Sequence, residues 1–285
     1  MSCYVAITPA RDEEILLPGL IASLCNQSCP PALWIVIDDG SSDKTGAILD
    51  QAARAHSWID VHHLERSRPR AAGGESVIMS FLRQEVWRRY DFILRLDADL
   101  TFESTLVGLL LREFARDRSL GIGGATLYER SEEGWSESRQ PSFHTRGALK
   151  MYSRECFATI GGLDSGLGWD TLDEARAMMH GYHTRSFRHI RARHHRRQGS
   201  AEGLVKGRLA AGRAAYRIGY SPAFMLARSV HRMFETPAIV GSAALLAGYV
   251  EGYLRRLPKA APPELQKFIR EQQVSRLLGR ESQWH

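Results

Sequence analysis

The segment Phe92-Ile-Leu-Arg-Leu-Asp-Ala-Asp-Leu-Thr101 joins an apolar run to two carboxylates that stand one residue apart. The apolar run predicts a short buried strand, which gives way to a loop at Asp97. Because side chains alternate along a strand, Asp97 and Asp99 leave it on the same side. Two carboxylates so placed suit a hard divalent cation such as Mg²⁺ or Mn²⁺. Aspartates also favour ordinary turns, so this pair alone predicts no function.

Short β-branched runs alternate with longer helical patterns from residue 4 to about residue 125. In the helical stretches, apolar residues recur at the spacing of one helix face. This alternation predicts βαβ units and an α/β fold with a mostly parallel, Rossmann-like sheet. The expected strands cover residues 5–7, 34–37, 61–64, 92–96 and 122–127, and the expected helices cover residues 13–25, 44–56, 75–89 and 105–116.

The chain changes character near residue 200. Residues 129–142 are polar and predict a loop or hairpin, after which helical patterns return at residues 153–160 and 170–181. From about residue 202 the sequence is rich in Ala, Gly, Arg and aromatic residues and shows no clear strand before a final helix at residues 264–278. The expected organisation is an α/β catalytic domain over residues 1–200 and a helical C-terminal extension over residues 201–285.

Composition limits the class of protein and its compartment. With 285 residues and 44% hydrophobic content, the chain is long and apolar enough to bury a core. The first eight residues read as a strand rather than as a secretory signal. The four cysteines form neither a CxxC pair nor a dense disulfide pattern, which favours reduced thiols and a cytoplasmic protein.

The net charge of +6 is concentrated between residues 185 and 232, where Arg, Lys and His greatly outnumber the acids. An excess of this kind predicts an anionic partner. Nucleic acid, phosphorylated small molecules and anionic lipid all satisfy the charge, and so does a solvated basic face without a partner. The sequence contains no recognisable nucleic-acid motif, so we expect no nucleic-acid partner.

Polar segments follow the first and second expected strands. Ligands of an open parallel sheet bind outside the carboxyl ends of its strands, so these segments are candidates for a binding site. The first reads Thr8-Pro-Ala-Arg-Asp-Glu-Glu14 and the second reads Ile37-Asp-Asp-Gly-Ser-Ser-Asp-Lys-Thr45. A turn and a helix N-cap explain residues 40–43. The adjacent carboxylates of Asp38 and Asp39 repel each other, and the donor groups of a nucleotide base and ribose would relieve that repulsion.

Together, TPARDEE, IDDGSSDKT and RLDADL resemble, in residue type and spacing, the family 2 glycosyltransferases over roughly the first 200 residues. Members of that family are inverting enzymes of the GT-A fold that use a nucleotide-diphosphate sugar. The resemblance implies that Asp39, with Asp38, contacts the nucleoside. It also implies that Asp99, assisted by Asp97, holds Mg²⁺ or Mn²⁺ on the donor diphosphate. The other residues that it assigns to the donor are Pro9, Ala10, Arg11, Asp12 and Glu13.

The resemblance continues toward a catalytic base. Family members carry a Gly-Gly-aromatic segment, an acidic pair at a helix start, an Arg and a Gly-Tyr. The corresponding residues are Gly161-Gly162-Leu163, Trp169-Asp170, Arg176 and Gly181-Tyr182. Asp170 aligns with the carboxylate that takes the proton of the acceptor hydroxyl during in-line attack. The chain departs from the family by placing Trp169 where Glu is usual.

The residues around Asp170 have rival explanations. Trp169 either stacks on the sugar ring of the donor or packs as a core aromatic. Asp173 and Glu174 follow on the same helix start, where the helix dipole favours acids without any catalytic role. They are therefore second choices for the base.

Two basic segments resemble phosphate-binding parts of the family. Residues 66–74 follow the third strand and open a helix, so Arg70 and Gly73 would approach a phosphate at the helix N-terminus. A solvent-facing loop is the alternative. His194-His195-Arg196-Arg197 resembles the family's late His segment. This resemblance implies His195 as a third metal ligand, with His194 as the alternative, and Arg196 or Arg197 as a phosphate clamp.

An uncharged run at residues 237–250 is shorter than the roughly 20 apolar residues that a membrane-spanning helix needs. Its flanks carry Arg228, His231 and Arg232 on one side and Arg255 and Arg256 on the other. This arrangement fits a helix that lies in the membrane interface beside anionic lipid. A buried helix, packed on the body or on a second subunit, is the competing interpretation.

These observations favour a metal-dependent, inverting glycosyltransferase of polysaccharide or lipid-linked glycan assembly, in the cytoplasm or peripheral on the cytoplasmic membrane face. Its acceptor would be a glycan or a lipid-linked molecule. Residues 97–101 also spell DxDxT, the signature of haloacid-dehalogenase-like phosphatases, in which Asp97 would attack phosphorus. That signature follows the first strand of the phosphatase fold, whereas three βα units precede it here. A non-enzymatic nucleic-acid or lipid-binding module is the third hypothesis.

Overall fold

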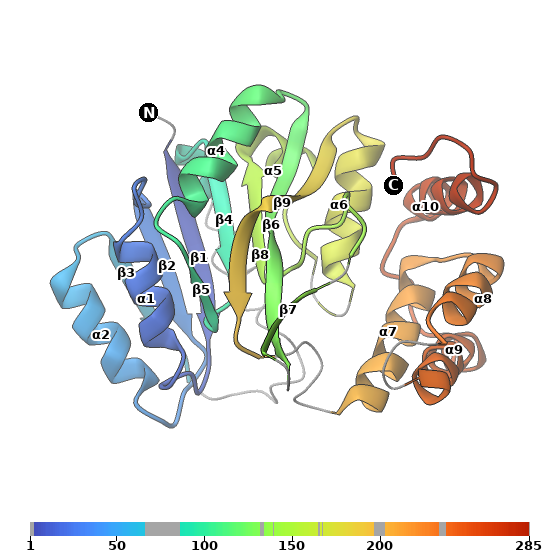
Figure 1. Ribbon diagram of the computed structural model, residues 1–285, viewed down its shortest axis with the longest axis horizontal. Helices are drawn as coiled ribbons and strands as arrows, with labels where there is room; N and C mark the ends of the chain where they lie inside the picture. Colours follow the sequence, from blue (N-terminus) through green and yellow to red (C-terminus); the bar gives the residue numbers. More distant parts are fainter. Residues whose placement is uncertain are drawn as a thin grey trace. The chain divides into compact units, whose positions relative to one another are not determined.

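The computed structural model describes residues 3–65, 86–131, 134–138, 140–164, 166, 168–196, 203–233 and 238–284 (Figure 1). The chain divides into two compact units. The first unit comprises Met1–Gly166 and His180–Arg196, and the second comprises Leu167–Met179 and Arg197–His285. Residues 167–179 therefore group with the C-terminal helices, although the sequence had placed them in a catalytic domain spanning residues 1–200.

The first unit is built on one mixed sheet, which has nine strands among the described residues. The strand order is β3-β2-β1-β4-β8-β6-β9-β5, with β7 paired to β6 (Figure 1). The strands are β1 (Tyr4–Ala10), β2 (Leu33–Asp38), β3 (Ile59–His63), β4 (Phe92–Leu96), β5 (Leu100–Phe102), β6 (Leu120–Ser131), β7 (Gly134–Glu137), β8 (Leu149–Ser153) and β9 (His183–His194).

The strand pairing confirms the predicted α/β fold class and refines it. β3, β2, β1 and β4 are parallel neighbours, as the βαβ pattern predicts. From β8 onward the sheet is mixed, because β8 runs antiparallel to β4 and β6, while β6 and β9 run parallel. β5 and β7 add antiparallel edges. All five expected strands overlap observed strands, whereas β5, β8 and β9 were not predicted.

Helices cover the sheet because their apolar sides match the buried faces of its strands. The helical segments of this unit are α1 (Leu17–Cys25), α2 (Thr45–Ala55), the 3₁₀ turn η2 (Val86–Arg89), α4 (Leu106–Arg116) and α5 (Arg154–Thr159). The central strands are buried along almost their whole length, with Trp34, Leu94 and Leu149 fully inaccessible. The helix predicted at residues 75–89 lies outside the described residues except for η2.

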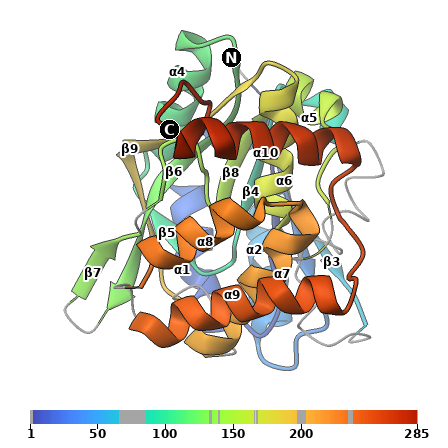
Figure 2. The same ribbon diagram turned by 90° about the vertical axis from the view of Figure 1, so that its right-hand side faces the viewer.

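The second unit is helical. It consists of α6 (Trp169–Met179), α7 (Leu204–Ile218), α8 (Pro222–His231), α9 (Ala238–Leu254) and α10 (Pro263–Leu277) (Figure 2). Glycines let α7 and α9 touch backbone to backbone. A Cβ added at Gly212 would lie 2.0 Å from the carbonyl oxygen of Leu245, and one at Gly248 would lie 2.0 Å from that of Leu209. The high Ala and Gly content of this part of the chain thus allows α7 and α9 to pack closely.

A hydrogen-bonded histidine ties β3 to the end of β2 and to α2. His63 Nδ1 lies 2.9 Å from Asp38 Oδ2, and its Nε2 lies 3.0 Å from Asp50 Oδ1. These two hydrogen bonds, that to Asp38 first, raise the pKa of His63 above its usual value. The protonated ring therefore stabilises the fold, and that stabilisation is complete below the unfolded pKa of about 6.5.

We predict that this stabilisation declines as pH rises through the folded pKa of His63. In His63→Asn, the side-chain amide retains a donor for Asp38 but carries no charge. The difference in free energy of unfolding between wild type and H63N should be largest below pH 6 and should shrink toward pH 9, as measured by urea unfolding. Asp50→Asn, which removes one carboxylate partner, should reduce this pH dependence. A difference that grows with pH would contradict the assignment.

Candidate active site

Hydrogen bonds join the loop after β1 to the loop after β2. The parallel register pairs Ala10 with Asp38, so both strands end at the same edge of the sheet. Asp12 N donates to Ser41 Oγ at 3.0 Å, and Ser42 N donates back to Asp12 Oδ1 at 2.8 Å. Asp12 has a φ of +53°, a strained angle that this reciprocal pairing holds in place. The two predicted donor-binding loops are therefore hydrogen-bonded to each other. Pro9 and Ala10 are the last two residues of β1.

Asp38 and Asp39 have separate partners within the protein. Asp38 is buried, and its carboxylate accepts from Ser41 N at 2.9 Å as well as from His63. Asp39 Oδ2 lies 3.3 Å from a guanidinium nitrogen of Arg11. The repulsion that suggested a nucleotide ligand is thus relieved by His63 and Arg11. Adjacency of the two carboxylates alone is therefore no sign of a ligand.

Three side chains from two distant segments meet beyond the end of β4. Ligand atoms of Asp97, Asp99 and His194 all lie within 4.8 Å of one another. Asp99 directly precedes β5, and β5 pairs with the end of β9, which sets Leu100 opposite His194. His194 Nε2 lies 3.3 Å from Asp99 Oδ1, and both side chains are almost fully buried. Two carboxylates and one imidazole so placed can hold a divalent cation.

Within this cluster, Asp99 and His194 each stabilise the charged form of the other. Burial lowers the pKa of His194, but the carboxylates of Asp99 and Glu129 outweigh burial and raise it to about 9. Burial raises the pKa of Asp99, whereas its contact with His194 outweighs that effect and lowers it. Asp97 pairs with the buried Arg95 at 2.7 Å. Each acid of the cluster therefore has its own cationic neighbour.

The neighbouring histidine, His195, follows the last residue of β9 and contacts different side chains. His195 Nε2 is 2.8 Å from Thr101 Oγ1, and its ring meets the edge of Trp135 with centroids 5.1 Å apart. Burial is the main cause that lowers the pKa of His195. Of the two histidines, His194 is the one whose ring nitrogen groups with Asp97 and Asp99, so we take it as the candidate ligand.

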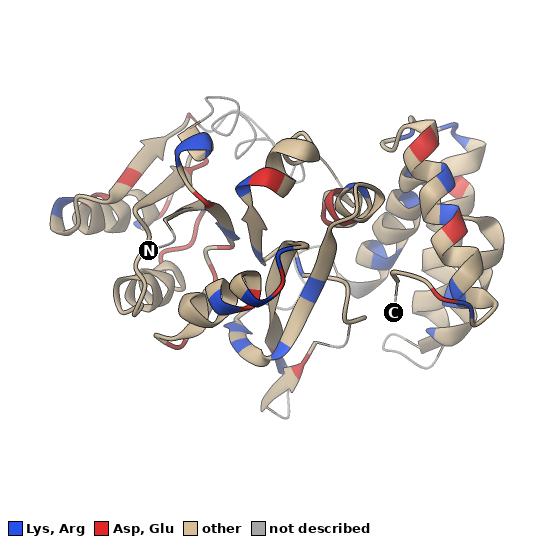
Figure 3. Ribbon diagram, turned by 90° about the horizontal axis from the view of Figure 1, so that it is seen from above, with Lys and Arg blue, Asp and Glu red and all other residues tan. Residues whose placement is uncertain are grey.

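Arg196 connects this cluster to the loop after β1, one of the two predicted donor-binding loops. Its guanidinium forms an ion pair with Glu13, whose side chain is nearly buried. Its charge also contributes to the lowered pKa of Asp99. The segment after β9 and the loop after β1 therefore converge beside the aspartates, and Figure 3 marks the acidic and basic residues along the chain. As a phosphate clamp, Arg196 would have to share its guanidinium with Glu13.

Asp170 belongs to the second unit. It lies in the first turn of α6, and its charge, with that of Glu174, acts on the buried hydroxyl of Tyr220. Burial is the main cause that raises the pKa of Tyr220. Asp173 and Glu174 are each 1% exposed, and Trp169 is 7% exposed, which fits a packed aromatic. Arg70 and Gly73 lie outside the described residues.

Sequence reasoning missed one pair of charged residues near the cluster. Glu129, near the end of β6, forms a 2.7 Å ion pair with Arg146. Burial raises the pKa of Glu129, but His194 and Arg146 outweigh burial and lower it to about 2. Glu129 follows a predicted strand, so the rule that drew attention to Asp97 would also have selected it. The polar sequence of residues 129–142 predicted a loop or hairpin, whereas β6 continues to Ser131.

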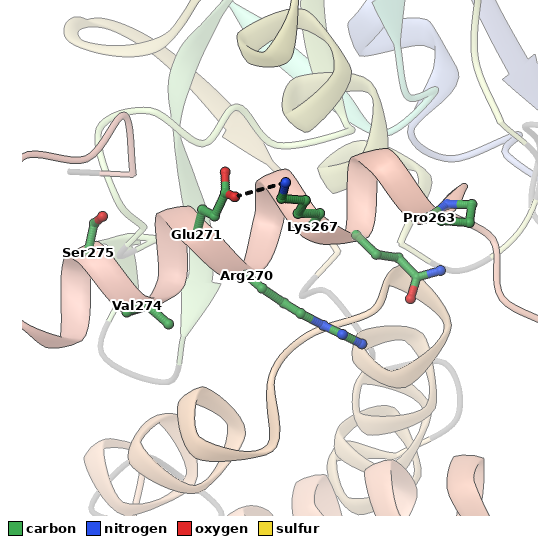
Figure 4. A pocket seen from close by; sticks show the side chains of 7 residues that line it. Pro263, Lys267, Arg270, Glu271, Val274 and Ser275 are labelled. Carbon is green, nitrogen blue, oxygen red and sulfur yellow. Dashed lines mark ion pairs between the residues drawn. The ribbon is translucent and has the colours of Figure 1, made fainter.

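A surface groove on the second unit offers no comparable chemistry. It runs along α10 and is lined by residues of that helix alone (Figure 4). Its charged contact is a surface pair, Lys267 and Glu271, at 4.0 Å. Such exposed pairs contribute little to binding or stability. We therefore place the candidate site at the aspartates and not at this groove.

Comparison with known proteins bears on the fold and the family. The curated relatives include a polyprenol monophosphomannose synthase from Mycolicibacterium smegmatis, 29% identical over 134 residues that cover 46% of this chain and 48% of the relative. An undecaprenyl-phosphate 4-deoxy-4-formamido-L-arabinose transferase from Pectobacterium carotovorum is 36% identical over 97 residues, 33% of this chain and 28% of the relative. The chain thus aligns with about half or less of these relatives.

Solved glycosyltransferase structures share the fold. The mannosyltransferase PcManGT from Pyrobaculum calidifontis, solved with GDP-Man and Mn²⁺, has a TM-score of 0.58 at 16% identity, covering 98% of this chain and 88% of its own. S. aureus TarS with UDP-GlcNAc has a TM-score of 0.60 at 16% identity, covering 98% and 92%. These likenesses confirm the GT-A fold. The model of the family described as "Glycosyl transferase family 2" matches residues 5–166, more than half of the chain. The chain therefore belongs to glycosyl transferase family 2.

Proposed function

We propose that the protein transfers a sugar, with inversion, from a nucleotide-diphosphate donor to an acceptor, and that Asp97, Asp99 and His194 bind a divalent cation for this reaction. The cluster of these three side chains beside the donor loops carries the proposal. Two carboxylates with one imidazole suit Mn²⁺ and also accept Mg²⁺. A cation there would neutralise charge that develops on the departing diphosphate.

The protein's own residues prepare the donor site. Arg95 holds the carboxylate of Asp97 from the buried side, and His194 fixes that of Asp99. Asp38 has both oxygens engaged by Ser41 and His63, so we assign it to support of the loop. The side chain of Asp39 is 24% exposed against 7% for Asp38, so Asp39 is the better nucleoside contact.

The cation site predicts a contrast between neighbouring histidines. Mn²⁺ with a suitable nucleotide sugar should raise the melting temperature of wild type, and Asp99→Asn and His194→Gln should each abolish that rise because they remove ligand atoms. His195→Gln is the matched control, because the neighbouring ring contacts Thr101 and is not part of the cluster, and it should keep the rise. The measurement is a thermal-shift screen of UDP- and GDP-sugars with and without Mn²⁺. A rise that depends on His195 but not on His194 would contradict the site.

The same variants separate transfer from the phosphatase hypothesis. A phosphatase that uses Asp97 as nucleophile would hydrolyse a phosphate ester and lose that activity in Asp97→Asn. The family match and the fold support transfer instead. A nucleic-acid-binding module would require salt-sensitive binding of DNA or RNA without any response to nucleotide sugars.

Asp170 is the proposed base if the acceptor reacts through a hydroxyl. Asp170→Asn should then lower kcat by about 10²–10⁴-fold while leaving donor-induced thermal stabilisation intact. Glu264→Gln is the matched control, because Glu264 also lies in the first turn of a helix and shares the dipole contribution. The measurement is steady-state transfer with a hydroxyl acceptor.

The outcome for Asp170 also distinguishes acceptor classes. The curated relatives are named for polyprenol and undecaprenyl-phosphate substrates. A phosphate acceptor is already ionised at neutral pH and needs no base. An unchanged kcat in D170N would therefore contradict the role of Asp170 and favour a lipid phosphate over a glycan hydroxyl.

We also propose that the second unit contacts an anionic membrane through α9. None of the helices that the structure describes combines the length and apolar character needed to cross a bilayer. The open side of α9 is nevertheless apolar, with Ile239 66% and Leu254 79% exposed. The one charged residue in the sequence of α9, Glu251, pairs with Arg213 and Arg255. An apolar face flanked by arginines fits the interface of an anionic bilayer.

This surface predicts vesicle binding that depends on α9. Ile239→Glu with Leu254→Glu should strongly reduce co-flotation with vesicles containing phosphatidylglycerol, because two charges would enter the apolar boundary. Val274→Glu is the matched control, since Val274 is an exposed apolar residue of α10. Equal loss in V274E would contradict a specific role of α9. If wild type binds no vesicles but forms concentration-dependent dimers that disappear in the α9 variant, α9 is a subunit interface instead.

A further inference from the structure

The imidazole of His194 has a carboxylate on each side. Its Nε2 faces Asp99 Oδ1 at 3.3 Å, within the proposed cation site. Its Nδ1 faces Glu129 Oε1 at 3.8 Å. Nδ1 is buried and makes no hydrogen bond within the part of the chain that the structure describes. The nearby carboxylate is therefore the acceptor available to an Nδ1 proton.

Backbone pairing fixes the position of Glu129. The parallel register of β6 and β9 sets Glu129 directly opposite His194, on the same sheet face. Arg146 holds the same oxygen, Oε1, at 2.7 Å and also donates to Ser138. The side chains of Glu129, Arg146 and His194 are 14%, 10% and 8% exposed. The carboxylate is thus anchored in a partly dry environment, where its charge acts strongly on the ring.

A metal-bound histidine needs a particular tautomer. The ring is neutral, the ligating nitrogen offers its lone pair, and the other nitrogen carries the proton. A carboxylate that accepts this proton fixes the tautomer and makes the ligating nitrogen a stronger donor to the metal. Closing the 3.8 Å separation to hydrogen-bond length requires a shift of about 1 Å.

We propose that Glu129 is a positioning residue of the cation site: it accepts the Nδ1 proton of His194 and so presents Nε2 to the cation. Arg146 fixes Glu129 in this orientation through its ion pair with Oε1. The inference rests on the proposed cation site of Asp97, Asp99 and His194. A purely structural ion pair between Glu129 and Arg146 is the competing explanation.

Glu129→Gln tests the role of the charge, because glutamine retains the size and one acceptor oxygen. The dissociation constant for Mn²⁺ should rise about 10–100-fold, as measured by electron paramagnetic resonance of free Mn²⁺. The matched control is Glu137→Gln, because Glu137, on the adjacent strand β7, also pairs with an arginine, Arg188 of β9. That control should bind Mn²⁺ within about twofold of wild type.

A second variant guards against misfolding. In E129Q, Arg146 faces a neutral amide, whereas Glu129→Gln with Arg146→Gln removes both charges together. This double variant should show the same loss of Mn²⁺ affinity. Nitrogen-15 spectra of the Mg²⁺-loaded proteins should show His194 protonated at Nδ1 in wild type and a mixture of tautomers in E129Q. An ion pair with only a structural role would leave these spectra unchanged.

The outcomes distinguish this inference from the site on which it rests. If wild type binds Mn²⁺ and His194→Gln abolishes that binding, while E129Q binds within about twofold of wild type, the role of Glu129 is overturned and the cation site stands. If wild type shows no Mn²⁺ binding that depends on Asp99, both proposals are overturned. Weakened binding in E129Q and in the double variant, with an altered tautomer, supports the role of Glu129.

Discussion

The short antiparallel pairing of β5 with β9 is the constraint on which the site depends. It sets Leu100 opposite His194, and His195 N donates to the carbonyl of Asp99 at 3.0 Å. These backbone bonds bring two segments that are far apart in the sequence to one point. They also bury the Asp99 carboxylate against an imidazole. Removing one partner of a buried ion pair costs about 3–5 kcal/mol, so fold and site are stabilised by the same contact.

Concentrating acids at one edge of a sheet is costly unless they are paired with cations, and five acids of this region have a cationic partner. The pairs are Arg95 with Asp97, His194 with Asp99, Arg146 with Glu129, Arg196 with Glu13, and Arg11 with Asp39. Because several of these side chains are largely buried, water screens their attraction weakly. The carboxylates are consequently held in place before any ligand arrives. Such preorganisation is what a binding site for a cation and a diphosphate requires.

Much of this arrangement follows from the sequence, and the exceptions have physical causes. Apolar runs identified the parallel strands, and strand alternation put Asp97 and Asp99 on one side. Strand β9 was missed because arginines and histidines interrupt its apolar positions and a register shift near Ala125 breaks the alternation. Once β9 is recognised, buried Ile190 and Ala192 continue in steps of two to His194. The partner of Asp38, His63, lies 25 residues away, and no local pattern reveals such a contact.

The residues that we propose for the reaction are divided between the two units. The proposed cation ligands and donor loops belong to the sheet of the first unit, whereas Asp170 belongs to the second. Within the second unit α6 packs against α10, and α9 packs against α7 and α8. The proposed base and the proposed membrane face therefore share one helical body. Under these proposals, the base and the membrane contact belong to the second unit, whereas the residues proposed to hold the nucleotide sugar belong to the first.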